Sequence, residues 1–134
     1  MTVIKKEQTA STVSHVEFDV VLQNRINLIL EVLAKKAGEY AGDEDRLHNF
    51  EAATAIMEAA GFETSREREI VSMAMRHIVS VLDLVRKNML GESIPREMIS
   101  EKIGDNINYL ILLEAGLYAE QECITKRNKN KGSA

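Results

Sequence analysis

Two long segments of this chain are apolar on every side of the helix that each would form. Residues 71–85 place valine, leucine, isoleucine and methionine around most of the circumference, and residues 107–113 repeat the pattern. A surface helix needs only one apolar stripe, so a helix that is apolar all round is a buried one. We therefore predict a homo-oligomer, most simply a dimer with these two helices at its interface. The alternative is a monomer that buries both helices in a large hydrophobic core.

Glycine, proline and capping residues divide the chain into four predicted helices. Aromatic residues make up 4% of the chain and proline occurs once, which suits helices better than sheets. Capping-box patterns begin helices at Ser14 and Thr64, and Gly61 and Gly91 supply left-handed stops. The predicted helices cover about 14–38, 46–60, 64–90 and 93–122.

These helices predict an all-α fold, a four-helix bundle-like domain completed by homo-oligomerisation. The domain covers residues 14–122. A flexible arm of residues 1–13 precedes it, and a basic, disordered tail of residues 123–134 follows.

Composition excludes several classes of protein. The formal net charge of -4 argues against an extended nucleic-acid surface, because binding phosphates along a duplex requires clustered lysine and arginine. The lone Cys123 cannot form an internal disulfide, which indicates a reducing compartment. No apolar run is long enough for a membrane span, and the polar first residues do not resemble a signal peptide. We expect a cytoplasmic protein without a membrane partner.

A polar stripe enters an apolar environment on the last predicted helix. Glu101, Asp105 and Asn108 share one helical face, which continues into Leu112. Buried carboxylates require partners, so these groups either bond to neighbouring helices or line a cavity for a cation or polar ligand. Oxygen ligands of this kind suit Mg²⁺. Glu101 and Asp105 are the predicted metal ligands.

Two further regions carry chemically useful groups. His77 lies among apolar positions of the third predicted helix, as a core residue with a hydrogen bond or as part of a site. The connection between the first two helices is rich in polar side chains that can bind a ligand, or it is a solvated linker with an aspartate as helix cap. Its candidate residues are Tyr40, Asp43, Arg46, His48 and Asn49.

The residues 101–110, EKIGDNINYL, resemble a helix of the MazG-like, all-α NTP pyrophosphatase superfamily that reads approximately E-E-L-G-D-x-L-x-Y-L. The stretch 40–43, YAGD, followed by HNF at 48–50, is similar to a phage and prophage branch of that superfamily whose members mostly lack an assigned activity. The resemblance covers about residues 30–118. It implies an all-α oligomer that hydrolyses a nucleoside triphosphate with Mg²⁺.

The metal motifs of the superfamily are only partly present. Asp105 matches the aspartate of the E-x-x-D motif, but Lys102 stands where its glutamate would be, with Glu101 one place away. The E-E-x-x-E motif has no counterpart, since the corresponding region of the third helix contains Arg76 and His77. Lysine and arginine repel Mg²⁺ and attract phosphate. The resemblance thus implies a ligand site with a degenerate metal centre, to which Lys102 contributes.

Three functions remain open at this point. The chain is a Mg²⁺-dependent pyrophosphatase, a non-catalytic protein that sequesters a nucleotide or phosphorylated signal, or a module that binds a host protein. The second fits a phage protein that counters host defence. We predict binding of a nucleotide or phosphorylated ligand, without identifying catalytic residues.

Overall fold

The computed structural model describes residues 11–35 and 45–132. All the regular secondary structure within these residues is helical: α1 (His15–Ile29) continues into a π-helical turn, η1 (Leu30–Ala34), and is followed by α3 (His48–Ala59), α4 (Arg66–Met89) and α5 (Arg96–Gly132). The predicted all-α class is confirmed. No helix in the described part of the chain is both long and apolar enough to cross a membrane.

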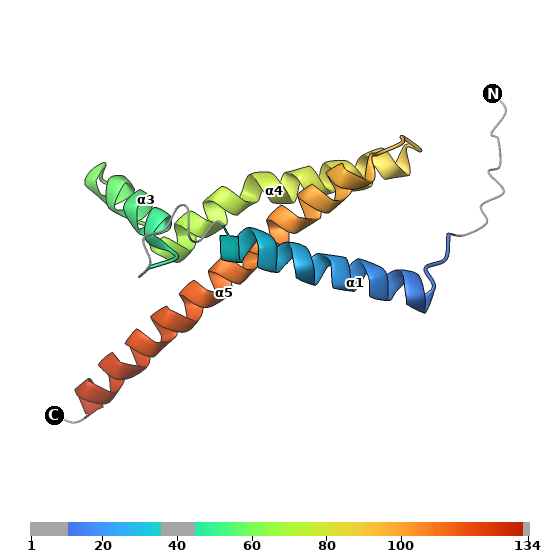
Figure 1. The fold of residues 1–134 in the computed structure, drawn as a ribbon. Coiled ribbons are helices and arrows are strands. Elements are labelled where there is room, and N and C mark those ends of the chain that lie inside the picture. The colour runs from blue at the N-terminus through green and yellow to red at the C-terminus, as the bar shows by residue number, and fades with distance from the viewer. Residues whose placement is uncertain (1–10, 36–44, 133–134) are drawn as a thin grey trace.

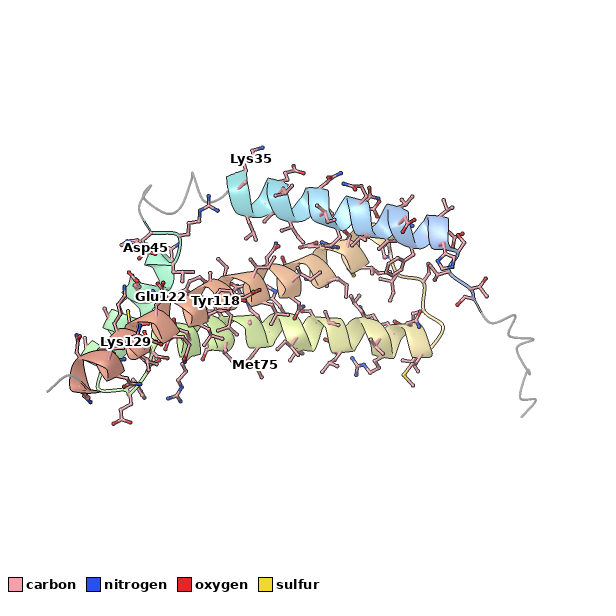
Figure 2. The ribbon with its side chains drawn as sticks, turned by 90° about the horizontal axis from the view of Figure 1, so that it is seen from below. Lys35, Asp45, Met75, Tyr118, Glu122 and Lys129 are labelled. Carbon is pink, nitrogen blue, oxygen red and sulfur yellow. The ribbon has the colours of Figure 1, made fainter. Side chains whose placement is uncertain are left out.

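The helices α4 and α5 form the centre of the molecule. They run antiparallel and make the most extensive contact between two elements (Figure 1). Helix α5 lies between α1 and α4, as Figure 2 shows, and the short α3 packs against α4. The C-terminal part of α5 continues beyond the N-terminal end of α4 (Figure 1).

Local capping explains where the helices begin. The Ser14 hydroxyl accepts the Glu17 N–H at 3.1 Å and the Glu17 carboxylate accepts the Ser14 N–H at 3.2 Å, so the predicted capping box is confirmed. The second predicted capping box does not form. Ser65, not Thr64, caps α4 by accepting the Arg68 N–H at 3.1 Å. Thr64 instead donates to the buried Glu69 carboxylate at 2.6 Å, which satisfies an otherwise costly charge.

The helix ends follow the predictions in two places and depart from them in one. Gly61 (φ 93°) and Gly91 (φ 75°) both adopt the left-handed conformation predicted for helix stops. The predicted end of the last helix near Glu122 is wrong, because α5 continues through most of the expected disordered tail to Gly132. Lysine, arginine and glutamine favour helices, and cations near the C-terminus interact well with the helix dipole. Of the predicted arm, residues 11–13 lie outside any helix and 1–10 are not among the described residues.

The core of the single chain is small. Leu47, Phe50 and Ile70 form a buried cluster, and three partly buried α5 residues pack against it: Tyr109, Leu112 and Leu113. By contrast, many large apolar side chains of α1, α4 and α5 remain exposed. One chain therefore does not bury its two most apolar helices. The homo-oligomer that would cover these helices is still a prediction from the sequence.

Candidate functional site

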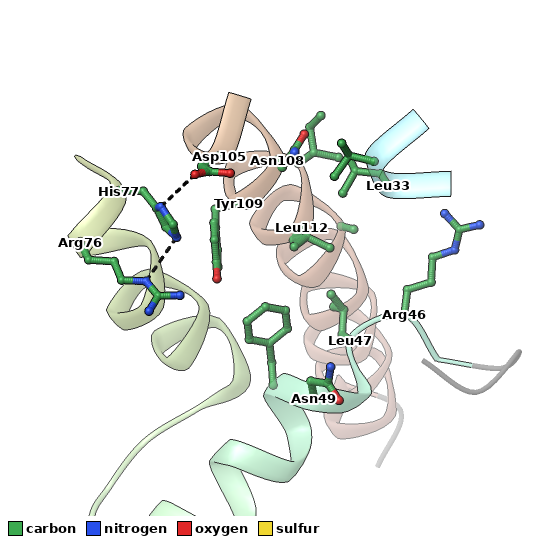
Figure 3. Close-up of a pocket in the computed structure, with 14 residues that line it drawn as sticks. Leu33, Arg46, Leu47, Asn49, Arg76, His77, Asp105, Asn108, Tyr109 and Leu112 are labelled. Atoms are coloured by element: carbon green, nitrogen blue, oxygen red, sulfur yellow. Dashed lines mark hydrogen bonds and ion pairs between the residues drawn. The ribbon is translucent and has the colours of Figure 1, made fainter. Parts of the chain in front are cut away.

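A cavity of about 520 Å³ lies where four elements meet. Its walls come from η1, the start of α3, the middle of α4 and the middle of α5 (Figure 3). Most of its lining is apolar, and the polar groups are few. The side chains that carry chemistry are Arg46, Asn49, Arg76, His77, Asp105, Asn108 and Tyr109.

The turn before α3 positions Arg46 at one side of this cavity. The Asp45 carboxylate accepts the Leu47 N–H at 2.9 Å, which closes a turn around Arg46. Leu47 and Phe50 anchor that turn in the core. The pKa of Asp45 lies below its ordinary value of 3.8, first because its carboxylate accepts this backbone hydrogen bond and then because it bonds to Glu51. The aspartate predicted as a possible cap thus has a structural role.

Three side chains form a chain of polar contacts on the opposite side. His77 Nδ1 lies 3.4 Å from Asp105 Oδ2, and the Arg76 Nε–H donates to His77 Nε2 at 3.3 Å (Figure 3). Because Nε2 accepts from Arg76, Nδ1 is the ring nitrogen that can donate to the aspartate. Asp105 therefore orients the ring, and the ring orients Arg76.

Aromatic rings form the wall between the two arginines. Tyr109 lies against the His77 ring, with centroids 4.9 Å apart and planes tilted by 30°. Phe50 meets Tyr109 edge to face at 6.3 Å. Such contacts fix the ring orientations and keep this wall apolar.

One buried polar atom in the wall has no partner. Within the described part of the chain, Asn108 Oδ1 is the buried side-chain oxygen or nitrogen without a hydrogen bond. An unsatisfied buried acceptor costs about 1–3 kcal/mol, so such an atom requires an explanation. A ligand N–H or O–H in the cavity would provide the missing donor.

The hydrogen bonds by which Asn106 joins α5 to α4 were not predicted from the sequence. The Asn106 amide donates to the His77 carbonyl and to the Lys102 carbonyl, both at 2.8 Å. It fixes the rotation of α5 beside His77 and thereby brings Asp105 to the imidazole. An asparagine beside a predicted site residue is too common a feature to have signalled this role.

The structure brings together five predicted site residues and leaves others apart. Arg46, Asn49, His77, Asp105 and Asn108 all line the cavity. The exposed His48 and the half-buried Lys102 are not among its lining residues. Tyr40 and Asp43 lie outside the described residues. The aromatic side chains of Phe50 and Tyr109 were not predicted as part of a site, because each resembles an ordinary core residue in sequence.

The proposed metal ligands face different surroundings. Glu101 lines a neighbouring cavity of about 570 Å³, which it shares with Asp105, Arg25 and Arg96. Arg25 crosses α5 there, donating to the Ser100 carbonyl at 2.9 Å beside Gly104, where a Cβ would lie 2.5 Å from Arg25 Nη1. Among residues 11–35 and 45–132, no three His, Cys, Asp or Glu side chains are grouped so that they could hold a metal ion.

Comparisons with protein-family models, with curated proteins and with solved structures found no match to this chain.

Proposed function

We propose that this cavity binds a nucleotide or another small phosphorylated molecule. The observation that carries the proposal is the combination of two arginines on opposite sides of an aromatic wall (Figure 3) with an unpartnered acceptor, Asn108 Oδ1, in the lining of the same cavity. Binding pockets for small molecules have this composition, being mostly apolar with a few well-placed polar groups. The resemblance to MazG-like proteins belongs to this proposal and supports the same ligand class.

The charges of the cavity favour an anion. Arg46 and Arg76 carry two positive charges, and Asp105 carries one negative charge. Guanidinium groups present donors that match phosphate oxygens, often in pairs. A phosphate group would therefore be held by the arginines, with the Asp105–His77 pair keeping Arg76 in place.

The remainder of the ligand would occupy the apolar part of the cavity. Asn108 Oδ1 accepts hydrogen bonds, so it selects a group with an N–H or O–H, such as the exocyclic amine of a base or a sugar hydroxyl. Phe50 and Tyr109 provide apolar surface for a planar ring. A phosphorylated molecule with such a ring matches these features better than inorganic phosphate does.

We further propose that binding is accompanied by little or no turnover. Cleavage between the α- and β-phosphates with Mg²⁺ requires carboxylates that converge on the metal to neutralise developing charge. Asp105 is engaged with His77, and Glu101 shares its cavity with two arginines. The function would then be to sequester a nucleotide or phosphorylated signal, as in an inhibitor directed at a host factor or signal.

Ligand-induced stabilisation tests the binding. The purified chain would be melted with nucleoside mono-, di-, tri- and cyclic phosphates, each with and without Mg²⁺. A ligand at about 100 times its Kd adds about 2.7 kcal/mol to native-state stability, which raises the melting temperature by several degrees. Arg76→Ala should abolish the shift. The matched control is Arg86→Ala, which removes an exposed arginine of the same helix that pairs with Asp83 and does not line the cavity.

Two outcomes would contradict the binding proposal. One is the absence of a shift with every nucleotide, which would favour a module that binds a protein. The other is an equal loss of shift in Arg76→Ala and Arg86→Ala, because a nonspecific charge effect would explain it.

Pyrophosphate release tests the absence of turnover. Each common NTP and dNTP would be incubated with the chain at millimolar Mg²⁺. We expect release far below about 1 s⁻¹, the lower end of ordinary enzyme rates. A faster rate that Asp105→Ala abolishes would establish a working pyrophosphatase and refute the sequestering function.

A further inference from the structure

Helix α4 carries two apolar stripes of the same spacing, of which the chain covers only one. The inner stripe is packed toward α5, and its residues are buried or half-buried: Ile70, Ala74, His77, Val81 and Leu84. The outer stripe begins one residue later, and all of its residues are exposed: Val71, Met75, Ile78, Leu82, Val85 and Met89. One residue turns a helix by about 100°, so the outer stripe faces away from α5. Met75 illustrates this orientation in Figure 2.

The outer stripe has the spacing of a coiled-coil seam. Its residues alternate in steps of four and three along a single straight helix of 24 residues, over about 27 Å. This repeat keeps an apolar line facing one partner helix. None of the six positions is polar, so ordinary exposure to water does not explain the stripe.

We infer that the outer stripe pairs with the same stripe of a second copy, antiparallel and about a two-fold axis between Ile78 and Leu82. The spacing reads identically in both directions, as a symmetric interface requires. Antiparallel pairing opposes Val71 to Met89, Met75 to Val85, and Ile78 to Leu82. Each pair of opposed residues then combines one side chain that is branched at Cβ with one that is not. A parallel pair would instead place Val71 against Val71 and Met75 against Met75. Layers of two β-branched side chains would then alternate with layers of two unbranched ones, which fill the interface less evenly.

Charge at the ends of the stripe supports the same orientation. Arg68 lies one heptad before Met75, Glu92 lies one heptad after Val85, and both are exposed. Antiparallel pairing brings Arg68 of one copy toward the turn that contains Glu92 of the other. Parallel pairing would bring the two Arg68 side chains together, which is unfavourable.

The outer stripe is long enough for a two-helix interface, because its six apolar side chains extend over about 27 Å of α4. The cavity with Arg76 and His77 lies on another side of α4, so this pairing does not depend on the proposed ligand.

Sedimentation of the full chain at micromolar concentration tests the pairing. We expect a particle of twice 15.0 kDa. Leu82→Glu should yield a monomer with an unchanged helical circular-dichroism spectrum. Leu110→Glu is the matched control, because Leu110 of α5 is 63% exposed and Leu82 is 62% exposed. A monomeric wild type would overturn the inference, as would dissociation by Leu110→Glu but not by Leu82→Glu.

Disulfide formation tests the orientation in a Cys123→Ser background. We expect a mixture of Ile78→Cys and Leu82→Cys chains to form the mixed disulfide, because a disulfide requires Cα atoms within about 7 Å. Faster self-linkage of either chain alone would indicate a parallel pair and overturn the antiparallel arrangement.

Discussion

The two stripes of α4 differ in a way that reverses the usual relation between polarity and exposure. The inner stripe, which the chain buries, includes His77. The outer stripe, which the chain leaves in solvent, consists only of large apolar residues. A buried polar group with specific partners indicates a site, whereas an exposed apolar row indicates a surface that another molecule covers. The comparison is the reason why we propose ligand binding on one side of α4 and self-association on another.

The largest expected difference between the stripes concerns stability. Ile70→Ala empties a fully buried position, and Ile78→Ala shortens a side chain that is 43% exposed. We expect Ile70→Ala to lower the free energy of unfolding by about 2–5 kcal/mol at every protein concentration. The loss in Ile78→Ala should be smaller and should grow with concentration, because that residue stabilises only the paired chain. Urea unfolding at two concentrations measures both, and equal, concentration-independent losses would remove the distinction between the stripes.

The second prediction concerns the affinity for a nucleotide, and it tests whether the inner stripe contributes to a ligand-binding site. Asp105→Asn removes the charge that holds the His77 Nδ1–H and should weaken binding of the best nucleotide about ten-fold, or about 1.4 kcal/mol. The fold should remain, because the Asp105 side chain is 35% exposed. Calorimetric titration gives the affinity, with Asp83→Asn as control for loss of a carboxylate paired on the surface of α4. Unchanged affinity with a sharply lower melting temperature would make Asp105 structural.

A third prediction separates the ligand-binding role of Asn108 from a packing role. Asn108→Leu replaces an unsatisfied acceptor with an apolar group of similar size, and the free protein should gain about 1 kcal/mol in stability. The same change should reduce the ligand-induced rise in melting temperature, since the ligand loses its acceptor. Thermal unfolding with and without the nucleotide measures both effects. A less stable free protein would show that the amide is required for the fold.

The smallest effect concerns Asp45, which holds the turn at Arg46. Its pKa is lowered in the folded state, so its contribution to stability is fully present above the ordinary value of 3.8 and is lost as the pH falls through the lower folded value. Asp45→Asn should therefore be less stable than the wild type at pH 7. The difference should shrink only below about pH 3.8. Unfolding curves at pH 7, 4 and 3 check the sign, and a difference that increases in acid would contradict it.

Some residues of the predicted site line one cavity and others do not, and both outcomes have physical causes. Asp105, Asn108 and His77, which line it, were predicted because polar groups among apolar helical positions require partners. His48 was assigned to the site by its neighbours in sequence, yet consecutive residues at a helix start point in different directions, and His48 does not line the cavity. Tyr109 could not be distinguished from a core residue until its contact with His77 was known.

The sequence by itself determined the helices and most of their ends. Ser14 caps α1, and Gly61 and Gly91 stop α3 and α4, because capping and left-handed backbone depend on residues adjacent in the chain. Only the tertiary structure decided which stripe of α4 is packed toward α5. Both stripes place apolar side chains at the same spacing, and they are offset by one residue, or about 100° of rotation. Contacts between helices choose that rotation, among them the hydrogen bonds of Asn106 to the His77 and Lys102 carbonyls, and the choice brings His77 to Asp105.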